Sequence, residues 1–159
     1  MTNGKLHYMA AADGLLRGRH EGFTQQIGQL SVLLVDGKAW ADLISDRIVY
    51  LKFYAIDSFQ TEGALMLLHT YPDYEVHRKE HDSITTEMRA ILAQIIDNGA
   101  SMPLLTQAGS RLVQTLQSHV LHHDGKLFDY LDRSGMRRER SADNDTAAEW
   151  LPGRIQQGV

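Results

Sequence analysis

The chain has 159 residues, no cysteine and a formal net charge of -4, with 16 Lys and Arg against 20 Asp and Glu. This length fits one domain with its own core, and the acidic balance argues against nucleic acid, whose binders need a basic face to neutralise phosphates. Without cysteine, disulfides and thiolate metal sites are excluded, which leaves His, Asp and Glu as the strong metal ligands. We find no signal peptide and no apolar run near the roughly 20 residues that span a bilayer, so we expect a cytoplasmic protein without membrane contact.

Apolar residues recur every three or four positions in four long segments, as expected for amphipathic helices. The first segment covers about 13–35 and stops at an Asp-Gly pair, and the second covers about 38–69 and ends before a Tyr-Pro pair. The third covers about 74–97 and stops at an Asn-Gly pair, and the fourth begins after Pro103 and runs to about residue 133. Four helices with short connections predict an all-α, up-down-up-down four-helix bundle.

The last part of the chain has a different character. Residues 134–159 are polar, charged and only weakly periodic, with little that could join a core apart from Trp150, Leu151 and Ile155. We therefore expect a bundle domain over residues 1–133, followed by a polar tail or the start of a linker to a further domain.

Each predicted helix carries a metal-capable side chain on or beside its inward face. His77 and His81 lie four residues apart, so both imidazoles project from adjacent turns of one face and can bind a single metal. One such pair also arises by chance, and a lone core histidine is usually only hydrogen-bonded. Companions on the other helices favour a metal, because without one their burial would leave costly unpaired groups. The candidate ligands are His20, Glu62, His77, His81, His119 and Asp124.

These motifs resemble the hemerythrin and bacteriohemerythrin family over roughly residues 8–132. The segment SFQTEGALMLLHTYPDYEVHRKEH places a Phe and a Glu, a Met, Tyr-Pro and His-x-x-x-His in the spacing of that family, and HVLHHD supplies its later His-x-x-x-x-Asp. His20, within RHEGFTQQIGQL, is similar to the first-helix histidine of the family. The resemblance implies a hemerythrin-like bundle with a non-heme di-iron centre, bridged by an oxo or hydroxo group and two carboxylates, that reacts with dioxygen.

The resemblance also implies a role for each candidate: three histidines bind one iron, one histidine binds the other, and two carboxylates bridge. By this resemblance, His77, His81 and His119 would bind one iron, His20 would bind the other, and Glu62 and Asp124 would bridge the two. The chain departs from the family at Ser58, which stands where the family has a histidine four residues before the bridging glutamate. Because serine is a poor iron ligand, the iron held by His20 is expected to keep two positions for solvent or an exogenous ligand.

Other metal sites fit the sequence less well. Ferritin-like di-iron proteins need Glu-x-x-His on two helices, which this chain lacks, and His20-Glu21 has no second histidine at the zincin spacing. An HD-type phosphohydrolase stays open as an alternative, since His81-Asp82 and His123-Asp124 supply the nominal His-Asp pairs. Such an enzyme would need basic residues that bind the substrate phosphate, and the inward faces of the predicted helices lack them.

Several polar neighbours fall outside the predicted ligand set. His69 lies about 10 Å beyond the glutamate along the helix, too far for the same iron, so a structural or exposed position is expected. We expect His122 and His123 behind the ligands or in solvent, Tyr54 in packing contacts and Asp57 in solvent.

Three functions can use a centre of this kind: a sensor, an oxygen store or carrier, and an oxidase or peroxidase. Reversible carriage needs one open position and a protected oxygen adduct, so the vacancy expected at Ser58 weighs against it. We therefore expect an oxygen- or redox-sensing domain that regulates a fused or partner signalling domain. The resemblance suggests an output of the cyclic di-GMP type, and storage or oxidase chemistry stays as the alternative.

Overall fold

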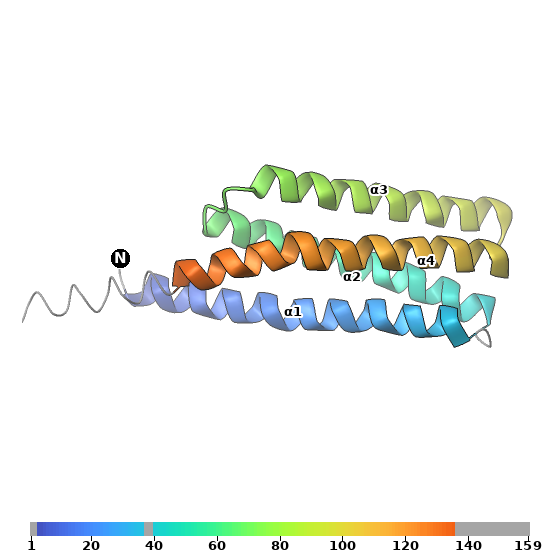
Figure 1. The fold of residues 1–159 in the computed structure, drawn as a ribbon, viewed down its shortest axis with the longest axis horizontal. Coiled ribbons are helices and arrows are strands. Elements are labelled where there is room, and N and C mark those ends of the chain that lie inside the picture. Colours follow the sequence, from blue (N-terminus) through green and yellow to red (C-terminus); the bar gives the residue numbers. More distant parts are fainter. Residues whose placement is uncertain (1–2, 37–39, 136–159) are drawn as a thin grey trace, which may run out of the picture.

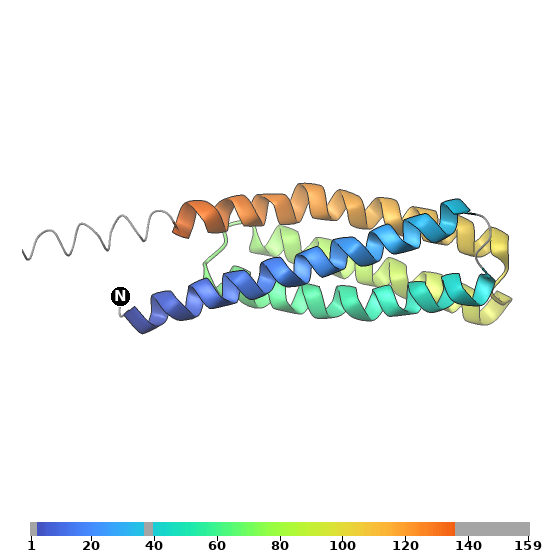
Figure 2. The same ribbon diagram turned by 90° about the horizontal axis from the view of Figure 1, so that it is seen from below.

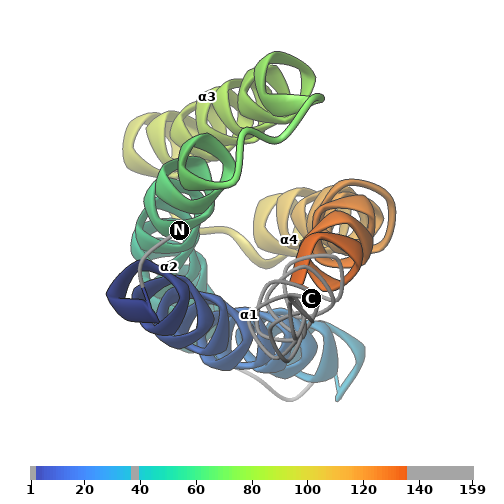
Figure 3. The ribbon, with the colours of Figure 1, turned by 90° about the vertical axis from the view of Figure 1, so that its left-hand side faces the viewer.

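The computed structural model describes residues 3–36 and 40–135, and the predicted tail lies almost entirely outside this part of the chain. Four helices alternate in direction and lie side by side, which confirms the predicted up-down-up-down bundle (Figures 1 and 2). Seen end-on, they surround a common interior, with α4 beside α1 and α3 beside α2 (Figure 3). The helices are α1 (Asn3–Asp36), α2 (Ala41–Leu68), α3 (Tyr74–Asn98) and α4 (Met102–His119).

Two helix boundaries differ from the sequence prediction. α1 begins at Asn3, about ten residues earlier than its apolar periodicity indicates. The fourth helix is not one continuous α-helix, because a π-helical turn, η1 (Val120–Asp124), interrupts it before residues 125–135 resume the α-helix. The end of α3 was predicted correctly, since Gly99 takes the positive φ of 78° that an Asn-Gly stop favours.

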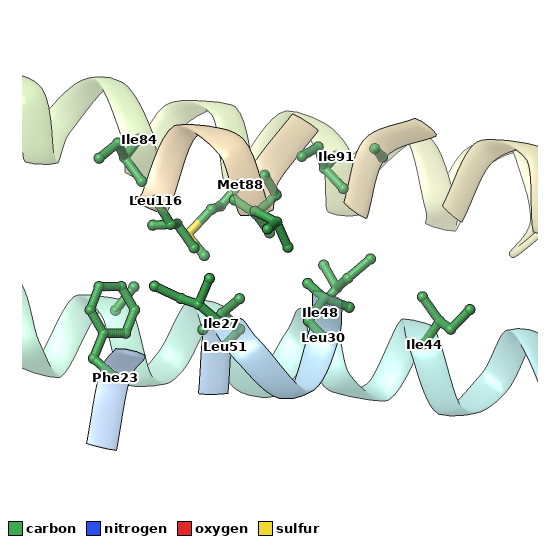
Figure 4. Packing of buried hydrophobic residues seen from close by; sticks show 14 of the residues in the cluster. Phe23, Ile27, Leu30, Ile44, Ile48, Leu51, Ile84, Met88, Ile91 and Leu116 are labelled. Carbon is green, nitrogen blue, oxygen red and sulfur yellow. The ribbon is translucent and has the colours of Figure 1, made fainter. Parts of the chain in front are cut away.

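The larger apolar core fills the half of the bundle nearest the α1–α2 connection. Inward side chains from all four helices interlock there, and Figure 4 shows Met88 and Leu116 facing Ile27 and Leu51 across the interior. Truncating one such fully buried Leu or Ile to Ala typically costs about 2–5 kcal/mol. The members shown and labelled are Phe23, Ile27, Leu30, Ile44, Ile48, Leu51, Ile84, Met88, Ile91 and Leu116.

A second, smaller apolar cluster closes the other end of the bundle. Leu16 of α1 and Leu65 and Met66 of α2 pack there with Leu127 and Leu131 from the last helical segment. Near this end the Tyr130 hydroxyl donates a hydrogen bond of 2.9 Å to the main-chain carbonyl of His69. Along every helix, the candidate metal ligands fall between the two apolar clusters. None of the described helices is long and apolar enough to cross a membrane.

Candidate metal centre

Five of the six candidate ligands meet in one buried cluster. Glu62 comes from α2, His77 and His81 from α3, His119 from the end of α4, and Asp124 from η1. One potential ligand atom from each lies within 4.8 Å of all the others, and all five residues are buried. The spacing that the sequence predicted therefore brings these donors to one place.

Asp124 contacts histidines on three helices. Its Oδ1 atom lies 3.2 Å from Nε2 of His77 and 3.0 Å from Nε2 of His119. Its other oxygen, Oδ2, lies 3.3 Å from Nε2 of His20 in α1, the sixth candidate. The two oxygens thus face different histidines, as a carboxylate that bridges two metal ions would require.

Glu62 lies on the α3 side of the cluster. Its Oε2 atom is 2.9 Å from Nε2 of His81 and 3.5 Å from Nε2 of His77. Its Oε1 atom is buried and has no hydrogen-bond partner among the described residues. One oxygen is therefore shared by two histidines of α3, and the other is left for a further positive group.

The π-helical turn explains how His119 and Asp124 reach the same point. In a regular α-helix, residues five apart lie about 140° apart around the axis, so both could not face the interior. A π-turn accommodates an extra residue and brings positions five apart nearly into line. This turn was not predicted, although the His-x-x-x-x-Asp spacing in HVLHHD is the signal that could have indicated it.

The unsatisfied polar atoms of the cluster fit a bound cation. The carboxylate oxygens of Glu62 and Asp124 and the Nε2 atoms of His20 and His77 are buried, and their short contacts lack hydrogen-bond geometry. Nε2 of His81 and Nε2 of His119 also lie only 3.1 Å apart. Buried polar atoms without partners are costly, and a cation among them would satisfy all the donors together. Imidazole and carboxylate ligands suit iron, zinc and manganese.

The carboxylates and histidines also shift one another's pKa values. Burial alone would raise the pKa of Asp124, but His119, His20 and His77 hold it below its ordinary value. Burial alone would lower the pKa of His77, yet Asp124 and Glu62 raise it to about 9. The pKa of His81 is lowered, because burial outweighs the attraction of Glu62. Asp124 is thus ready to bind metal at neutral pH, whereas His77 must first lose a proton.

We expect metal to stabilise the fold more as the pH rises from 6.5 to 9. In the metal-free protein, the raised pKa of His77 adds stability that is complete below its ordinary value of 6.5 and is lost as the pH approaches 9. Metal binding needs the neutral ring, so His77 alone should raise metal affinity about tenfold per pH unit over this range. Melting temperatures measured anaerobically with and without iron(II) test this. If iron(II) raises the melting temperature by the same amount at every pH in this range, the expectation is contradicted.

A layer of aromatic rings surrounds the cluster. Phe59 stacks on His81 with 3.9 Å between ring centroids and an interplanar angle of 10°. His123 is half-buried and stacks on His119 at 5.4 Å, as expected for a residue behind the ligands. The sequence predicted the candidate ligands but not this packing, since stacked neighbours follow from the way the helices pack.

The remaining polar candidates have other contacts. His69 is buried, and its Nε2 atom lies 2.8 Å from Oδ1 of Asp13. Of the two positions expected for His69, structural or exposed, the structure shows the structural one. The Tyr54 ring stacks on Phe23, and Asp57 is exposed and pairs with Arg19. His122 is exposed to solvent.

Ser58 is buried, and its hydroxyl has no hydrogen-bond partner among the described residues. It lies one helical turn before Glu62 on the inward face of α2.

Comparison with known proteins identifies the family. Residues 12–131 match the family described as Hemerythrin HHE cation binding domain, and this range contains all six candidate ligands. No curated protein and no solved structure gives a significant match. The buried cluster of imidazoles and carboxylates agrees with the cation binding that the family description states. The chain therefore belongs to the hemerythrin HHE cation-binding family.

Proposed function

We propose that the chain is a di-iron domain that senses oxygen or cellular redox state. The irons would supply reversible electron transfer and an open position for a small ligand. Three histidines hold one ion, one histidine holds the other, and two carboxylates hold both. In this proposal the residues are His77, His81 and His119, then His20, then Glu62 and Asp124.

Unequal exposure of the two ends of the cluster supports this proposal. The His20 side chain is 19% exposed, whereas the histidines of the other proposed ion are 7% exposed or less. Ser58 supplies no imidazole on the adjacent helix, so His20 is the only histidine proposed for its ion. The ion with fewer ligands is thus also the one nearer to solvent, where an exogenous ligand can enter.

The observation that favours a sensor is a chain of contacts from His20 to the last helical segment. The His20 ring packs edge-on against Phe128, with 4.8 Å between centroids. The guanidinium of Arg17 lies 4.9 Å from the Phe128 centroid and pairs with Asp132. A ligand or redox change that moves His20 would therefore act on the helical segment 125–135. We propose that a fused or partner signalling domain, such as one of the cyclic di-GMP type, receives this change.

Phe128→Leu tests the sensor proposal. In the iron-loaded parent, hydrogen exchange over residues 125–135 should differ at least about threefold between the reduced and oxidised states. Phe128→Leu should remove most of this difference, because its side chain packs less closely against the His20 ring. Phe53→Leu is the matched control, since Phe53 is an exposed phenylalanine on α2. Equal exchange of residues 125–135 in both oxidation states of the parent would contradict the proposal.

A further inference from the structure

An open groove runs along the face between α2 and α3. It encloses about 510 Å³, within the range of cavities that hold small molecules. The α2 wall includes Phe59, Gly63 and Leu67, and the α3 wall includes Tyr74 and Arg89. This groove lies outside the cluster of ligand atoms, but His81 also lines it.

The groove therefore reaches the edge of the proposed metal centre. His81 is a proposed ligand of the iron held by three histidines, and Phe59 stacks on its ring at 3.9 Å. A molecule in the groove would contact Phe59 or His81 directly. Electrons could pass from it to the metal through one aromatic contact, without entry of the donor into the interior.

The lining of the groove suggests what kind of molecule it takes. Phe59, Leu67 and Tyr74 present apolar and aromatic surface, which suits a flat ring system. Arg89 is exposed and has no ion-pair partner among the described residues, so it can bind an anionic group. The other cation of the groove, Arg78, is already paired with Glu75 and Asp82.

We propose that this groove binds a reduced flavin mononucleotide, which delivers electrons to the metal centre through Phe59 and His81. The isoalloxazine ring lies on the aromatic surface, and the phosphate binds Arg89. The neutral hydroquinone gives one electron to each of two ferric ions, releases two protons to solvent and leaves as oxidised flavin. This inference rests on the proposed di-iron function, because it requires two ferric ions as electron acceptors.

Gly63→Leu tests the groove by filling it. A Cβ atom at Gly63 has no neighbour within 4 Å, so the added side chain should enter open space, and leucine favours the helix. Gly14→Leu is the matched control, because Gly14 of α1 has equally free space and does not line the groove. We expect Gly63→Leu to weaken binding of flavin mononucleotide at least tenfold, measured by flavin fluorescence, and to slow reduction of the diferric protein by the reduced flavin to a similar extent.

Arg89→Gln tests the phosphate contact. It should weaken binding of flavin mononucleotide about tenfold but leave binding of riboflavin, which lacks the phosphate, unchanged. Lys79→Gln is the control, since it removes an exposed α3 cation that does not line the groove. Parental flavin affinity in both Gly63→Leu and Arg89→Gln would overturn the proposal.

Two further measurements separate this inference from the proposed function. Dithionite should reduce the iron-loaded parent and Gly63→Leu at equal rates, because a small reductant does not need the groove. If iron loads and dithionite reduces it, but reduced flavin acts equally on both proteins, only the flavin proposal fails. If no iron loads, the proposed function fails and the electron transfer fails with it, while flavin binding to the metal-free protein still tests the groove.

Discussion

Replacement of Asp124 by Asn is expected to empty both metal positions, whereas His20→Ala should empty at most one. The two oxygens of Asp124 face histidines on either side, so its loss removes a ligand from both proposed ions. A carboxylate also offsets the repulsion between two cations, which a neutral amide cannot do. Loss of affinity should exceed the roughly 10–100-fold that is typical when an outer partner of a metal ligand is removed.

Metal analysis after reconstitution with iron(II) measures this difference, and circular dichroism shows whether each variant keeps its helices. Glu62→Gln serves as a second carboxylate variant and should behave like Asp124→Asn. If His20→Ala loses both ions while the two carboxylate variants keep both, the bridging roles are assigned wrongly.

Ser58→His is expected to give the ligand-poor ion a second histidine. Position 58 lies one helical turn before Glu62 on the same inward face, so an imidazole there would approach the cluster. The variant should bind azide about tenfold more weakly and oxidise more slowly in air, because one of the two proposed open positions would be filled. The larger ring should also lower the free energy of unfolding of the metal-free protein by about 1–3 kcal/mol, since Ser58 is fully buried.

Ser58→Ala is the matched control for this experiment. It removes a hydroxyl that has no hydrogen-bond partner among the described residues and adds no ligand, so iron content and azide affinity should stay at the parental values. Azide titrations of the iron-loaded proteins, followed by absorption, compare the three chains. A Ser58→His protein that keeps its iron and binds azide as tightly as the parent would show that Ser58 does not border the open position.

The buried faces of the helices were predictable from the sequence. Each three-four repeat marks one face, and on α2 the positions of that face from Ile44 to Leu65 are buried. The same repeat placed Glu62 and the two histidines of α3 in the interior, because a residue in register with apolar neighbours must face the same way. The family motifs then indicated that these side chains form a metal site.

Three features of the fold were not predicted from the sequence. The π-turn at Val120–Asp124 breaks the 3.6-residue period, so a regular helix could not predict that His119 and Asp124 face the same point. The start of α1 at Asn3 is not marked by apolar periodicity. The contact of His20 with Phe128 joins positions far apart in the sequence, and only the packing of α1 against the last helical segment reveals it.

The domain boundary at residue 133 and the polar tail stay predictions. The described helix continues to residue 135, and residues 136–159 lie outside the described part of the chain. A gene that fuses this bundle to a catalytic signalling domain, or a neighbouring gene that encodes such a domain, would support the sensor proposal.

The metal content of the chain decides whether the buried cluster and His20 hold two iron ions, as we propose. Reconstituted protein should contain two irons per chain, and the count should fall together with the absorption of the oxidised centre in Asp124→Asn. One zinc ion per chain, or less than half an iron after anaerobic reconstitution, would contradict the di-iron assignment.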